Sequence, residues 1–100
     1  ARSFVSQRLI ISLLFVGELE NASAWFTWYK NQPYHVRKNE SSARGMSYLA
    51  KNFARAGVRD VVFEIIDLVE SMIEIPVFNH ENEYLAQFKA NCFHDIAIKP

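Results

Sequence analysis

The sequence contains little glycine and little proline, with three residues of each in a chain of 100 residues. Because these residues interrupt helices and shape tight turns, their scarcity argues against a turn-rich β fold and favours long regular elements. Half of the residues are hydrophobic, which is enough to fill one core at this length and argues against disorder. We therefore expect residues 1–100 to form a single helical domain.

The chain also lacks a long apolar run, since none reaches the roughly 20 residues that a membrane span requires. Segment 9–16 is similar to the apolar core of a signal peptide, but Glu18 and Glu20 occupy the region where cleavage would occur. The single cysteine, Cys92, excludes an intrachain disulfide bond and fits a reducing compartment, where it is expected to be a small buried side chain. We expect a cytoplasmic protein that does not bind a membrane.

Motifs that carry catalysis or hold a cofactor are missing as well. The sequence has no glycine-rich phosphate loop, no H-E-x-x-H, no paired C-x-x-C and no nucleophile elbow. Cys92 and His94 are close in sequence, but residues two apart on a helix point about 200° away from each other. A zinc site formed by Cys92, His94 and His80 has no evident fourth ligand, and His35 is interpreted as a surface histidine. We therefore expect no enzyme activity, no cofactor and no metal site.

Two helices joined by a tight turn at Gly57 are predicted most clearly. The first begins near Ser41 or Ser42 and ends before Gly57, with apolar residues recurring every three or four positions. The second covers 60–74 and has Asp60 as its candidate N-cap. Both patterns are typical of amphipathic helices that pack against a core.

Segment 24–31 predicts a short aromatic helix after Asn21 or Ser23 as the N-cap. Trp25 and Trp28 share one face of this helix with Tyr29. Core packing is the simpler interpretation of this face, and an exposed binding anchor is the alternative. Residues 33–41 are expected to form a loop, and a last helix over 80–95 is expected to follow Asn79 as its cap.

The N-terminal segment, about 3–19, is apolar nearly all round and predicts a buried central helix. A buried strand over 9–16 is the alternative, because periodicity does not distinguish the two for a short apolar run. Short connections make neighbouring helices antiparallel. The expected fold is therefore all-α, a compact bundle of four to five helices.

Charge is distributed unevenly along a chain whose 11 basic and 11 acidic residues give no net charge. Residues 30–59 carry seven basic side chains and the single acid Glu40, whereas residues 60–83 carry seven acids and no Lys or Arg. A neutral total argues against a polycation that coats nucleic acid. This separation of basic residues in 30–59 from acidic residues in 60–83 is the most informative feature of the sequence.

The acidic residues of the 60–74 helix lie on an arc of about 120°. They are Asp60, Glu64, Asp67, Glu70 and Glu74. One interpretation is a solvated face that pairs in part with the preceding helix, Arg55 near Asp60 and Lys51 near Glu64. The other is a docking face for a basic partner, because a row of like charges destabilises a helix slightly and an interaction explains it. On this second interpretation we expect a small protein-binding regulator, an inhibitor or immunity-type protein that docks a basic partner such as a nuclease.

The basic half supports the alternative hypothesis, a nucleic-acid-associated regulator that binds RNA or single-stranded DNA. Its candidate residues are Arg37, Lys38, Arg44, Lys51 and Arg55. A helix-turn-helix over 42–73 is excluded, because its recognition helix would be the acidic one and DNA would repel it. A homodimer that joins a basic to an acidic face across a two-fold axis is a further candidate assembly.

Overall fold

The computed structural model describes residues 2–37, 40–72 and 79–98, and within these ranges it contains helices and no strand. The elements are, in chain order, α1 (Arg2–Phe15), α2 (Leu19–Lys30), the short 3-10 helix η1 (Pro33–His35), α3 (Glu40–Ala56), α4 (Arg59–Met72) and α5 (Asn79–Ile98). The prediction of an all-α bundle is confirmed. The alternative of a strand over 9–16 is wrong, because all of this segment except its last residue belongs to α1.

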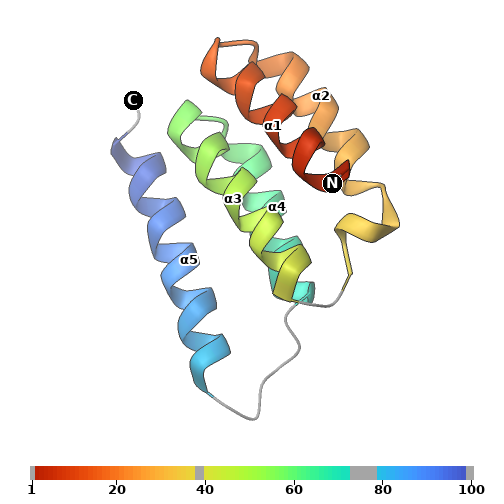
Figure 1. Ribbon diagram of the computed structural model, residues 1–100. Coiled ribbons are helices and arrows are strands. Elements are labelled where there is room, and N and C mark those ends of the chain that lie inside the picture. Colours follow the sequence, from red (N-terminus) through yellow and green to blue (C-terminus); the bar gives the residue numbers. More distant parts are fainter. Residues whose placement is uncertain (1, 38–39, 73–78, 99–100) are drawn as a thin grey trace.

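Helix α3 lies in the middle of the bundle and contacts α1, α4 and α5 (Figure 1). The pair α1 and α2 covers one side of the α3–α4 hairpin, and α5 covers the other side and runs parallel to α3. One cluster of buried side chains draws on every α-helix, for example Ile10, Phe26, Leu49, Ile65 and Phe88. Removing this apolar surface from water is the main force that holds the helices together.

Gly17 and Gly57 end α1 and α3 with the same backbone turn. Their φ angles are +84° and +82°, the left-handed conformation that glycine adopts without a steric penalty. After Gly57, the amide of Val58 donates to the carbonyl of Phe53 at 3.0 Å, which satisfies an otherwise unpaired carbonyl of the last turn. The prediction for Gly57 is confirmed, and Gly17 is a second turn of this kind that the sequence analysis did not identify.

Helix α4 begins one residue earlier than expected. The amide of Val62 donates to the carbonyl of Val58 at 3.3 Å, so helical hydrogen bonding is already established there and the helix starts at Arg59. Asp60 therefore lies in the first turn, and its predicted role as the N-cap is wrong. A carboxylate in the first turn still interacts favourably with the helix dipole.

Helices α2 and α3 also begin before their predicted caps. The residues predicted as caps lie inside these helices, Asn21 and Ser23 in α2 and Ser41 and Ser42 in α3. Asn79, the cap predicted for the last helix, is the first described residue of α5. Helix α2 starts at Leu19, because the chain changes direction at Gly17 and the next helix begins two residues later. Within the predicted loop 33–41, residues 33–35 form η1 and the helix α3 has already begun at residue 40.

Candidate functional site

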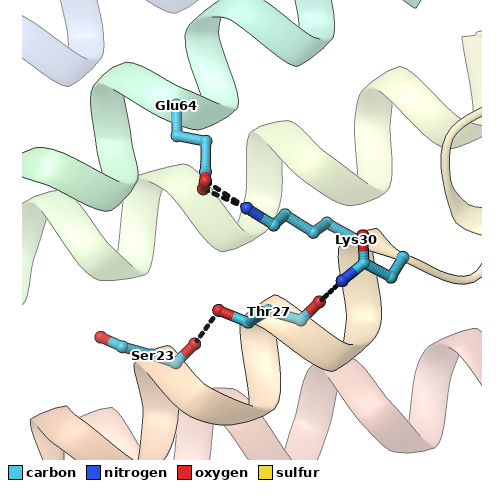
Figure 2. Close-up of polar contacts among 5 residues, drawn as sticks. Ser23, Thr27, Lys30 and Glu64 are labelled. Atoms are coloured by element: carbon cyan, nitrogen blue, oxygen red, sulfur yellow. Dashed lines mark hydrogen bonds and ion pairs between the residues drawn. The ribbon is translucent and has the colours of Figure 1, made fainter.

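The predicted acidic face of α4 is divided by two ion pairs to other helices. Nζ of Lys30, at the end of α2, lies 2.5 Å from Oε1 and 3.0 Å from Oε2 of Glu64 (Figure 2). Nζ of Lys89, on α5, lies 2.6 Å from Oε1 of Glu70. All four side chains are partly exposed, so each pair stabilises the fold by at most about 1 kcal/mol. Two of the five predicted carboxylates are therefore engaged within the molecule.

The expected pairing of α4 with α3 is wrong. Glu64 pairs with Lys30 rather than Lys51, and Nε of Arg55 lies 4.0 Å from Oδ2 of Asp95 on α5 rather than beside Asp60. Helix α3 uses its apolar face to contact α4, so its basic residues point away from that helix and toward α5 or solvent. The opposite charges of the two helices therefore do not meet along the hairpin.

Asp60 and Asp67 are the carboxylates of α4 that stay available. Both side chains are exposed, and neither has an ion-pair partner among the residues that the structure describes. Glu74, the fifth predicted residue, lies outside the described residues. Among the described carboxylates of the acidic face, Asp60 and Asp67 are therefore the ones without an ion pair.

Two phenylalanines lie beside these carboxylates. Phe63 on α4 and Phe93 on α5 are each 48% exposed, and their ring centroids are 6.2 Å apart. On the helical wheel Phe63 falls within the acidic arc, three residues after Asp60 and four before Asp67, so the three side chains are neighbours on one surface. We call Asp60, Phe63, Asp67 and Phe93 the α4–α5 face. The sequence analysis missed both rings, although a phenylalanine inside an arc of carboxylates was a readable signal.

The basic residues do not form one continuous track. Arg44, Lys51 and Arg55 are exposed on α3, with the half-exposed ring of Tyr48 among them. Arg37 is exposed after η1, whereas Lys38 lies outside the described residues. The guanidinium of Arg55 lies near the carboxylate of Asp95. The structure thus brings together one aromatic ring and a row of cations on α3.

The aromatic run on α2 is divided between the core and the surface. Tyr29 is buried, but Trp25 and Trp28 are each 43% exposed and pack edge to face against each other, with ring centroids 5.8 Å apart. The buried face of α2 is formed by Ala22, Phe26 and Tyr29, and the two tryptophans lie on its flank. Core packing is therefore the wrong interpretation for Trp25 and Trp28.

His35 is buried, not a surface histidine as expected. The η1 turn folds its ring onto Tyr29, with centroids 3.7 Å apart and nearly parallel planes, and Tyr34 lies on another side at 4.3 Å. Burial lowers the pKa of His35 from its usual 6.5, because the charged imidazolium loses hydration in this stack.

We expect this histidine to make the fold less stable in acid. Its folded-state pKa is below the unfolded value of 6.5, so the contribution of His35 is complete above that pH and is lost as the pH falls through the folded pKa. The free energy of unfolding, measured in urea between about pH 7.5 and about pH 5, should decrease with a steeper slope than in His35→Phe. The matched control is His94→Gln, which removes an exposed histidine from α5. An unchanged slope in His35→Phe would contradict this assignment.

The groups considered for catalysis do not assemble in the described part of the chain. Cys92 is buried, and burial together with Asp95 raises the pKa of its thiol to about 11, so no thiolate nucleophile is present at neutral pH. His94 points to solvent from the same helix, and His80 lies among side chains that are not described. Among the described residues, no three His, Cys, Asp or Glu side chains are placed to hold a metal ion.

The candidate functional features of the described helices are therefore their exposed side chains. No helix in the described ranges has the length and apolar character to span a membrane. No protein-family model, no curated protein and no solved structure matches the chain.

Proposed function

We propose that this protein is a cytoplasmic, non-catalytic regulator that binds another protein with a basic surface, as an inhibitor or an immunity-type protein does. The observation that carries the proposal is the exposed Phe63–Phe93 pair beside the carboxylates of Asp60 and Asp67. Aromatic anchors that become desolvated supply most of the affinity of protein interfaces. Acidic side chains around them attract a basic partner and orient it before contact.

The ion pairs of α4 indicate which of its side chains contact the partner in this proposal. Because Glu64 holds Lys30 and Glu70 holds Lys89, the contact is centred on the aromatic pair rather than on the whole acidic row. Loss of the aromatic rings should therefore increase the dissociation rate of the partner. Loss of Asp60 and Asp67 should mainly slow association and reduce its dependence on salt.

The test is affinity capture of the tagged protein from its native lysate at low salt, after nuclease treatment. The wild type should retain a stoichiometric basic protein, and the double variant Phe63→Ser, Phe93→Ser should lose it. Tyr48→Ser is the matched control, because it removes an equally exposed aromatic ring from α3 and should keep the partner. Circular dichroism should show the same helix content in all three proteins.

Capture that is unchanged in the double variant would refute the α4–α5 face as the binding site. Sedimentation velocity of the purified protein separates a second copy of the chain from a different partner. A dimer that dissociates with Phe63→Ser, Phe93→Ser would identify the basic partner as another copy of this chain.

Binding of RNA or single-stranded DNA is a second candidate function, favoured by the half-exposed Tyr48 among Arg44, Lys51 and Arg55 on α3. A base stacks on an exposed aromatic ring while neighbouring cations contact phosphates. Retardation of an oligonucleotide in a gel should then weaken steeply as salt rises, and the triple variant Arg44→Ala, Lys51→Ala, Arg55→Ala should lose it. No retardation at low salt would remove this candidate.

A further inference from the structure

A cavity of about 220 Å³ lies between α3 and α5, on a side of α5 other than that of Phe93. The two helices run parallel (Figure 1), and Arg55 beside Asp95 aligns the end of α3 with the last turns of α5. Helix α3 contributes Tyr48 and Lys51 to the cavity wall. Helix α5 contributes Phe88, Asn91, Cys92 and Asp95. The cavity shares no residue with the α4–α5 face.

The floor of the cavity is apolar. Phe88 and Cys92 are both buried members of the hydrophobic core, and the ring of Tyr48 stands half exposed at the opening. An apolar cavity of about 150 Å³ is enough for a benzene molecule. The larger volume here accommodates one six-membered ring with a short side chain.

The rim of the cavity carries a net positive charge. Lys51 is exposed at the rim, and the negative charge of Asp95 is offset by Arg55, whose Nε lies 4.0 Å from Oδ2 of Asp95. The amide of Gln87 donates from Nε2 to Oδ1 of Asn91 at 3.0 Å, which leaves the NH₂ group of Asn91 free to donate. The polar groups at the rim therefore favour a ligand that carries one negative charge.

A single charge is favoured over a double one. A phosphate monoester carries about −1.5 to −2 charges at pH 7, whereas Lys51 is the one cation among the residues that line the cavity. A carboxylate carries one charge and needs one ammonium group and one or two amide donors, which Lys51 and Asn91 supply.

We propose that the cavity between α3 and α5 binds a small aromatic carboxylate. Its ring lies over Phe88 and Cys92 and against Tyr48, and its carboxylate accepts hydrogen bonds from Lys51 and Asn91. Such a ligand adds an activity to the protein-binding role and does not depend on it. The side chains beneath the ring are the buried Phe88 and Cys92, so the ring contacts apolar protein surface.

The test is a titration of the ¹⁵N-labelled protein with 3-phenylpropionate, followed by amide chemical shifts in NMR spectra. Saturable shifts should centre on Tyr48, Lys51, Phe88, Asn91 and Cys92. The dissociation constant should be on the order of 1 mM or lower, as expected for a ligand of about eleven non-hydrogen atoms. The neutral analogue 3-phenylpropionamide should bind about tenfold more weakly, because it lacks the charge that Lys51 recognises.

Lys51→Gln removes the proposed ammonium group and should weaken 3-phenylpropionate binding about tenfold while leaving the amide analogue unaffected. Arg59→Gln is the matched control, since it removes an exposed cation from the start of α4 and should change neither affinity. Both substitutions are at exposed positions, so the fold is retained. Three results overturn the proposal: no saturable shift, equal binding of acid and amide, or unchanged affinity in Lys51→Gln.

Discussion

Replacing Phe53 by alanine should lower the free energy of unfolding by about 3–5 kcal/mol, the range observed for removing a buried aromatic ring. Phe53 is fully buried in α3, the helix that contacts α1, α4 and α5. Its ring packs edge to face against Phe26 of α2, with centroids 5.6 Å apart, and so connects α2 to the centre of the bundle. The truncation removes this contact and leaves a cavity that the surrounding helices fill only in part.

A domain of this size has a total stability of about 5–15 kcal/mol, so Phe53→Ala should leave a marginally stable protein. Urea unfolding followed by circular dichroism measures the loss as a lower midpoint with an unchanged slope. Phe63→Ala is the matched control, because it removes the same ring from an exposed site on α4 and should cost about 1 kcal/mol or less. A cost for Phe53→Ala as small as that of the control would contradict the position of Phe53 in the core.

The α3–α4 hairpin was predictable because its signals are local. Met46, Leu49, Ala50 and Phe53 recur at helical spacing and are all buried, and Gly57 ends the helix with a positive φ. The starts of α2 and α3 were less predictable. Polar residues such as Asn21 and Ser42 favour caps by propensity, but hydrogen bonding and turn geometry decide the boundary.

The candidate site was predictable only as far as one helix determines it. Asp60, Glu64, Asp67 and Glu70, the described carboxylates of the acidic face, belong to α4, so their common orientation follows from helical spacing. The ion-pair partners of these carboxylates do not follow from helical spacing, because Lys30 is 34 residues from Glu64 in sequence and its position depends on how α2 packs. The Phe63–Phe93 contact likewise joins two helices, and no pattern within either helix indicates it.

The sequence likewise does not determine which face of α2 contacts the core. Helical spacing places Trp25, Trp28 and Tyr29 near one another, but it does not determine where the core lies relative to them. In the structure the core contacts α2 along Phe26 and Tyr29, so the surface begins at the tryptophans. The direction from which α1 and α3 approach decides this boundary.

The thiol of Cys92 should react slowly with iodoacetamide as long as the protein is folded. Its side chain is 2% exposed, and burial followed by the nearby Asp95 raises its pKa from 9.0 to about 11. Two pKa units correspond to about a hundredfold lower thiolate fraction near pH 8, and the thiolate is the reactive form. Labelling followed by intact mass should therefore be at least about a hundredfold slower than in concentrated urea. The double variant Cys92→Ala, Ala97→Cys moves the thiol to an exposed position of α5 and should label rapidly without urea.

The same pKa shift predicts how stability responds to alkali. The folded state holds the Cys92 proton more tightly than the unfolded state, so this contribution is complete below pH 9.0 and is lost as the pH rises toward about 11. Burial also raises the pKa of Tyr29 above 10.0, which adds to the loss in the upper part of that range. Cys92→Ala should consequently flatten the fall in unfolding free energy above about pH 9 without removing it. Rapid labelling of the folded wild type would show that the thiol is accessible, and an unchanged alkaline slope in Cys92→Ala would show that its pKa is not raised in the folded state.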